Sequence, residues 1–207
     1  MCDVELVARQ DPTAGNERLT ATTALLLLVL LAAEGVTILS IRPLLSAHIV
    51  IGLLLIPPVA LKLLSTGYRF LRYYTGSADY VSKGPPHILM RALAPLLVVT
   101  TLTVLGTGLA MLALGPRHHR DLLLGLHKTS FVLWFFLMAV HVLVYAPRLP
   151  RLVFSGRSIG RRTALVASSV AAGALLAGAT YSLAGPWVHR AHDHERDAAG
   201  RYSTVVR

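Results

Sequence analysis

Long runs of apolar residues alternate with short polar segments along the chain. Five such runs lie at roughly residues 20–41, 44–65, 89–114, 123–146 and 163–187. As a helix rising about 1.5 Å per residue, each run is long enough to cross about 30 Å of hydrocarbon. The pattern therefore predicts an all-α integral membrane protein, a helical bundle of five transmembrane helices in a lipid bilayer.

The polar segments between the runs set how the helices connect. Only residues 41–43, which include a proline, separate the first two runs, and this predicts an antiparallel hairpin. The longest connection, residues 67–88, mixes tyrosines with basic residues and suits the headgroup layer. Pro57 and Pro58 lie inside the second run, where the loss of two backbone donors predicts a kink.

The distribution of arginine and lysine predicts the orientation. More of them flank the side shared by the N-terminus and the second and fourth connections, which favours a plasma-membrane protein with a cytoplasmic N-terminus and an external C-terminus. We therefore expect three regions. Residues 1–19 form a cytoplasmic tail, residues 20–187 the transmembrane bundle, and residues 188–207 an external tail.

Composition narrows the classes of function. The chain has 207 residues, 54% hydrophobic and 14% charged, with a mean hydropathy of +0.60, so a soluble catalytic domain of ordinary size does not fit beside the runs. The net charge of +10 comes from basic residues at the ends of the runs, which indicates membrane topology and not nucleic-acid binding. The single cysteine, Cys2, excludes a disulfide framework, a c-type haem and an iron–sulfur cluster ligated by this chain.

Two histidines in the fourth run carry the strongest chemical signal. His127 and His141 are fourteen residues apart, and fourteen helical steps advance about 21 Å while falling about 40° short of four full turns. Both imidazoles therefore project from nearly one face, close to opposite membrane surfaces. An imidazole in hydrocarbon is costly unless it is hydrogen-bonded or bound to a metal, so we expect the pair to serve something inside the bundle.

His48 lies at the same depth as His127 but in another run. It is about four residues into the second run from its outer end, and neutral imidazoles level on neighbouring helices are what axial ligation of haem iron requires. Gly52, one turn further, leaves space for the edge of the haem ring. The alternative is that these histidines only form hydrogen bonds within the bundle.

Four short motifs resemble those of one family. They are AHIVIG at 47–52, STGYR at 65–69, LHKTSFVLW at 126–134 and AVH at 139–141. The motifs look like those of bacterial di-haem b-type cytochrome membrane subunits, over roughly residues 20–150. Such proteins bind two haems in a four-helix bundle, one near each membrane surface. The resemblance therefore implies a four-helix haem-binding core plus one peripheral helix, with one or two b haems.

The resemblance also implies which residues bind the haems. His48 and His127 would ligate the outer haem, and His141 one side of an inner haem. Fourteen residues after His48, where such bundles carry a second histidine, this chain has Lys62. His87, at the inner start of the third run, is the expected replacement, and an interfacial role for it is the alternative.

Two charged residues complete the set of candidates. Glu34 is the only acid inside an apolar run. It is expected to hydrogen-bond a ligating histidine, to accept a proton from quinol, or to stay a neutral acid within the bundle. Arg69 belongs to a basic group at the inner surface, which would neutralise haem propionates or anchor the chain in the headgroup layer.

Together these residues predict a membrane b-type cytochrome that transfers electrons across the bilayer through one or two bis-histidine haems. Its expected partners are quinol or another donor, and a redox protein on the external side. The chain would then be the electron-transfer subunit of an oxidoreductase. The rivals are a cofactor-free membrane anchor and a metal-handling protein, in which the spans supply a metal path and the C-terminal tail collects ions. Five histidines on the expected outer side could form a labile metal site or belong to solvated segments, namely His118, His119, His189, His192 and His194.

Overall fold

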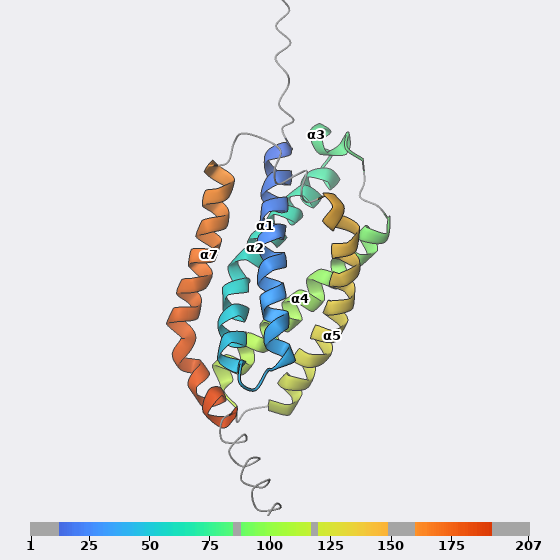
Figure 1. Ribbon diagram of the computed structural model, residues 1–207. Helices are drawn as coiled ribbons and strands as arrows, with labels where there is room; N and C mark the ends of the chain where they lie inside the picture. Colours follow the sequence, from blue (N-terminus) through green and yellow to red (C-terminus); the bar gives the residue numbers. More distant parts are fainter. Residues whose placement is uncertain (1–12, 85–87, 117–119, 149–159, 192–207) are drawn as a thin grey trace, which may run out of the picture.

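The computed structural model describes residues 13–84, 88–116, 120–148 and 160–191, and these are almost entirely helical (Figure 1). Five helices in these ranges are long and apolar enough to cross a membrane. They are α1 (Ala14–Leu39), α2 (Leu45–Tyr74), α4 (Ile88–Leu114), α5 (Arg120–Tyr145) and α7 (Gly160–Thr180). The predicted all-α fold with five long apolar helices is confirmed.

Short helical segments lie at the ends of the long ones. One-turn helix α3 (Ala78–Val81) lies between α2 and α4, and the 3-10 turns η1 (Ala146–Arg148) and η2 (Tyr181–Ala184) follow α5 and α7. Residues 185–191 are helical again. At the end of α4, Gly115 has a φ of 72° and its N–H donates to the Met111 carbonyl, the left-handed arrangement that commonly ends a helix.

Two helix boundaries differ from the sequence prediction. α1 begins at Ala14, so the last residues of the expected N-terminal tail are helical, and α2 continues to Tyr74 instead of ending near residue 65. Hydropathy marks where lipid can cover a helix, whereas backbone hydrogen bonding continues as long as no residue breaks it. Residues 66–74 contain no proline, so α2 extends beyond its apolar run.

The long helices form two groups (Figure 1). α1 and α2 form the predicted hairpin, and α7 packs along α2 and α1 on the side away from α5. α4 and α5 form a second closely packed pair, and the groups meet mainly where α2 approaches α4. α7, which the sequence placed outside the haem-binding core, is therefore a close neighbour of α2.

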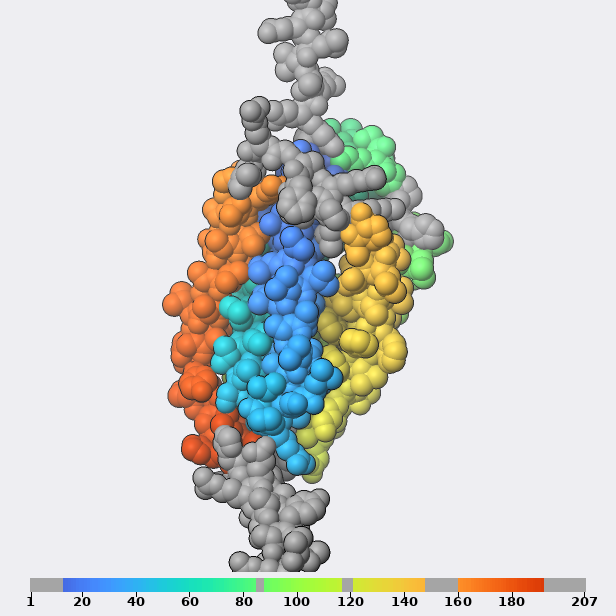
Figure 2. Space-filling model, viewed as in Figure 1, coloured from blue at the N-terminus to red at the C-terminus, as the bar shows by residue number. Residues whose placement is uncertain are grey.

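Buried apolar side chains join the helices at two places. Met90, Leu93 and Leu97 of α4 pack against α5, where the Trp134 indole N–H also donates to the Thr101 hydroxyl at 3.0 Å. A second cluster joins α2, α4 and the end of α7 through Leu53, Leu112, Ala177 and Ala184. Many other large apolar side chains are exposed, as expected for helices that face lipid. Figure 2 shows one face of this surface, with the helices coloured along the chain.

A glycine lets α7 approach α2 beside its two prolines. α2 continues as helix through Pro57 and Pro58, which have no N–H to offer the carbonyls of Leu53 and Leu54. A Cβ atom added at Gly173 of α7 would lie 2.5 Å from the Leu54 carbonyl oxygen. Only glycine fits this contact, and the α7 backbone thereby covers a carbonyl that Pro58 leaves without its helical donor.

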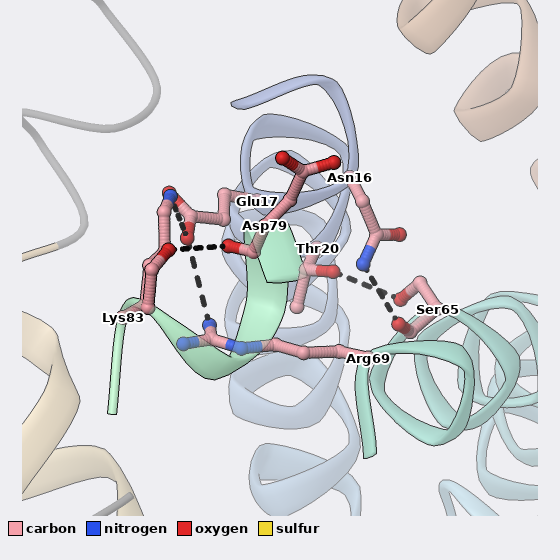
Figure 3. Close-up of polar contacts among 8 residues, drawn as sticks. Asn16, Glu17, Thr20, Ser65, Arg69, Asp79 and Lys83 are labelled. Atoms are coloured by element: carbon pink, nitrogen blue, oxygen red, sulfur yellow. Dashed lines mark hydrogen bonds and ion pairs between the residues drawn. The ribbon is translucent and has the colours of Figure 1, made fainter. Parts of the chain in front are cut away.

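Polar contacts tie α1 to α2 and α3 at the end of the molecule that carries α3 (Figure 3). Glu17 accepts from Lys83 Nζ at 2.8 Å. The Asn16 side chain donates to the Ser65 carbonyl, and the Thr20 hydroxyl donates to the Ser65 hydroxyl, both at 3.0 Å. These contacts lie at the expected inner surface, opposite the α1–α2 turn.

Candidate haem-binding site

His48 lies in the first turn of α2, and its imidazole is held by α1. Its Nδ1 atom is 2.9 Å from Glu34 Oε1 and 3.1 Å from Thr37 Oγ1. The Thr37 hydroxyl donates its own proton to the Glu34 carbonyl at 2.6 Å. Both neighbours therefore act as acceptors toward Nδ1, and this nitrogen carries the proton.

His127 lies on α5 and is held by α4 in the same way. Its Nδ1 atom is 3.0 Å from the Val104 carbonyl oxygen and 3.1 Å from Thr107 Oγ1. The Thr107 hydroxyl donates to the Thr103 and Val104 carbonyls, so it too can only accept from Nδ1. His127 is therefore also protonated on Nδ1.

The two imidazoles face each other between the two helix groups. Their ring centroids are 6.3 Å apart and their planes are nearly perpendicular, at 89°. Within the described part of the chain, neither Nε2 atom takes part in a hydrogen bond. Each ring thus has a protonated nitrogen directed to its supporting helix and a nitrogen lone pair left for a ligand.

Two glycines leave room around the pair. A Cβ added at Gly52 would be 3.5 Å from Glu34 Oε1, and one added at Gly108 would be 3.3 Å from His127 Cε1. Gly52 therefore lies beside the carboxylate that supports His48. Gly108 likewise leaves room for the His127 ring, because a side chain at position 108 would press against it.

The structure brings together His48, His127, Glu34 and Gly52 among the predicted site residues. Glu34 Oε2 is buried and has no hydrogen-bond partner in the described ranges. Arg69 lies elsewhere, at the end of the bundle that carries α3, with its guanidinium 3.9 Å from Glu17 (Figure 3).

The predicted inner site is described only in part. His141 lies far along α5 from His127, and its ring packs against Tyr145 at a centroid distance of 4.9 Å. His87, its expected partner, lies outside the described residues.

Sequence reasoning missed the residues that hold the imidazoles. Thr37, Thr107 and the Val104 carbonyl fix the histidine tautomers, and Gly108 makes space for His127. A signal existed for two of them, because Thr107 and Gly108 adjoin within a polar interruption, GTG, of the third apolar run. A backbone carbonyl acceptor leaves no trace in a sequence.

The ligand set fits a porphyrin better than a bare metal ion. Zinc and copper sites usually take three or four protein ligands, and the described residues contain no group of three or more histidine, cysteine or acidic side chains that could hold a metal. A porphyrin supplies four equatorial nitrogens itself, so two opposed imidazoles complete its iron.

Comparison of the chain with protein-family models, with curated proteins and with solved structures gives no match. The fold and the geometry of the site therefore carry the functional argument. They define an all-helical protein with five candidate membrane spans and one pair of facing imidazoles between its helix groups.

Proposed function

We propose that this chain is a membrane b-type cytochrome subunit, in which His48 and His127 bind haem b at the outer end of the bundle. The observation that carries the proposal is the facing pair of imidazoles, each with Nδ1 held by acceptors and Nε2 left for a ligand. Both histidines are half-buried, and an imidazole inside a membrane protein is costly unless its nitrogens are hydrogen-bonded or bound to a ligand. A free lone pair on each of two neighbouring rings therefore favours a bound ligand over a cofactor-free anchor.

The separation of the rings supports axial ligation. An imidazole nitrogen binds a first-row metal at about 2 Å and the ring centre lies about 1 Å behind that nitrogen, so two imidazoles on opposite sides of one iron have centres about 6 Å apart. The centroids of His48 and His127 are 6.3 Å apart. The side chains thus stand at a separation that ligation requires.

Glu34 and Val104 would tune the two ligands differently. Glu34 offers a carboxylate oxygen to His48 and Val104 an uncharged carbonyl to His127, and a stronger acceptor on Nδ1 makes Nε2 a more basic ligand.

Bound haem supplies a reversible one-electron couple. This would let the chain transfer electrons in the plasma membrane, from quinol or another donor to a redox partner outside. The resemblance to di-haem cytochromes adds an inner haem at His141.

The purified protein is expected to show the spectrum of low-spin b haem. Bis-imidazole ligation makes the iron six-coordinate and low-spin, so a reduced-minus-oxidised spectrum should show sharp α and β bands. Pyridine haemochrome analysis, with protein quantified separately, gives the haem per chain, and chelation followed by metal analysis tests for other metals. Protein expressed with an adequate haem supply but free of haem would refute the proposal.

Gly108→Val is expected to disturb the site, while Gly106→Val on the same helix is not. A Cβ at Gly108 meets His127 at 3.3 Å, whereas one at Gly106 meets nothing within 4 Å. The added methyls at 108 should turn the imidazole away from its ligating position, lowering haem content and shifting the low-spin spectrum. Because both variants place a β-branched residue in α4, equal haem loss would assign the effect to helix propensity and not to the site.

A further inference from the structure

Lys62 is a lysine inside the bundle that forms no ion pair with any acid of the described residues. Lys62 lies on α2, half-buried, and its Nζ donates to the Thr20 carbonyl of α1 at 2.9 Å. One carbonyl satisfies one of the three N–H groups of an ammonium. In a membrane interior, charged side chains are normally paired.

The acidic residues of the described ranges are engaged or placed elsewhere. Glu17 pairs with Lys83, and Glu34 pairs with His48 at the opposite end of α2. Asp79 belongs to the exposed helix α3, and Asp121 lies in the first turn of α5 at the far end of the bundle. None of them forms an ion pair with Lys62.

Lys62 stands in the same relation to His48 as His141 does to His127. Each is fourteen residues further along its helix, which carries both toward the inner surface on nearly the face of the first residue. Because α2 and α5 run in the same direction (Figure 1) and their rings at His48 and His127 are 6.3 Å apart, Lys62 and His141 lie at about the same level of the bundle. Within the described residues His141 forms no hydrogen bond, and its ring contacts Tyr145.

We propose that Lys62 is the counter-ion of a cofactor carboxylate at the inner site, namely a propionate of a haem that His141 ligates. This inference rests on the proposed function. The ammonium and the imidazole lie at one level of the bundle, and no acid of the described residues forms an ion pair with Lys62. A haem would bring both an iron for the imidazole and carboxylates for the ammonium. Anchored by the Thr20 carbonyl, Lys62 can donate its remaining N–H groups to a propionate.

The test combines a protein change with a cofactor change. Full-length apo-protein in detergent is titrated with haem and with haem dimethyl ester, whose propionates are methylated and uncharged. The proteins are wild type, Lys62→Met and Lys62→Arg, with Lys83→Met as a lysine control at the surface pair with Glu17. Binding and midpoint potential are followed separately for the inner and outer components, and apo-protein melting checks folding.

We expect wild type to bind two haems. Lys62→Met should weaken the inner one at least about tenfold, the size of a lost charge-assisted hydrogen bond, and should lower its midpoint potential because a positive charge is removed. Lys62→Arg should restore binding, and Lys83→Met should bind haem as wild type does. With the dimethyl ester, wild type and Lys62→Met should bind equally well. Changing the lysine and the propionate in turn forms a double-mutant cycle, which isolates the interaction between them.

Three outcomes would overturn the inference. In the first, the wild-type protein binds a single haem, and this haem is lost in the His48 and His127 variants. In the second, the Lys62→Met protein binds both native haems as tightly as wild type does. In the third, Lys62→Met weakens binding of the dimethyl ester as much as it weakens binding of haem. All three leave the proposed function intact. A wild type that binds no haem would overturn the proposed function itself, and this inference with it.

Discussion

Replacing His127 by alanine is expected to abolish the proposed outer low-spin haem. The iron of that haem would lose one of its two proposed axial ligands, so the spectral component should disappear or become high-spin. His48→Ala should remove the same component, because His48 faces His127 at 6.3 Å. The measurement is the reduced-minus-oxidised spectrum together with haem content of each purified variant.

His189→Ala is the matched control, since His189 is exposed and lies outside the site. It should keep the full spectrum. Each variant is first shown to fold by the thermal midpoint of its apo form. A folded His127→Ala protein with unchanged haem content and spectrum would exclude the pairing of these two histidines.

A single methyl group at Gly173 is expected to destabilise the bundle strongly. The new Cβ would lie 2.5 Å from the Leu54 carbonyl oxygen and 3.0 Å from its Cα, and a backbone cannot move aside as a flexible side chain can. Forcing extra atoms into a packed interface costs about 1–3 kcal/mol. The Gly173→Ala protein should therefore unfold at a clearly lower temperature in detergent.

Gly178→Ala provides the comparison on the same helix. Gly178 is exposed, and a Cβ there meets nothing within 4 Å, so this change should leave stability unchanged or raise it, because alanine favours helix over glycine by roughly 1 kcal/mol. The two substitutions are chemically identical and are expected to act in opposite directions. Equal thermal midpoints would show that α7 does not depend on its close contact with α2.

The sequence was sufficient to predict the five long apolar helices. It also placed His48 level with His127, and the two rings lie 6.3 Å apart. Helices that cross a membrane have long apolar runs in the sequence. The rise and rotation per residue of an α-helix are fixed, so the relative depths of residues such as His48 and His127 can be calculated from their positions in these runs. The tight α1–α2 turn was also predictable, because so few residues separate the runs.

The sequence did not predict the contacts between helices. Which helix supports which imidazole depends on packing, so the roles of Thr37 and the Val104 carbonyl emerged only in three dimensions. The close approach of Gly173 to Leu54 was hidden for the same reason, since a small-residue segment indicates close packing without naming the partner. Glu34 stands out in the sequence as the only acid inside an apolar run. The sequence left open whether it supports a histidine, accepts a proton from quinol or stays a neutral acid.

The order of the helices along the chain bears on how the protein is made. Every described residue of the His48–His127 site precedes α7, so the residues of the site are synthesised before α7. During that interval the Leu54 carbonyl, deprived of its helical donor by Pro58, has no α7 backbone above it. α7 is therefore made after the helix that it covers, and its arrival shields a proline-weakened stretch of the helix that carries His48.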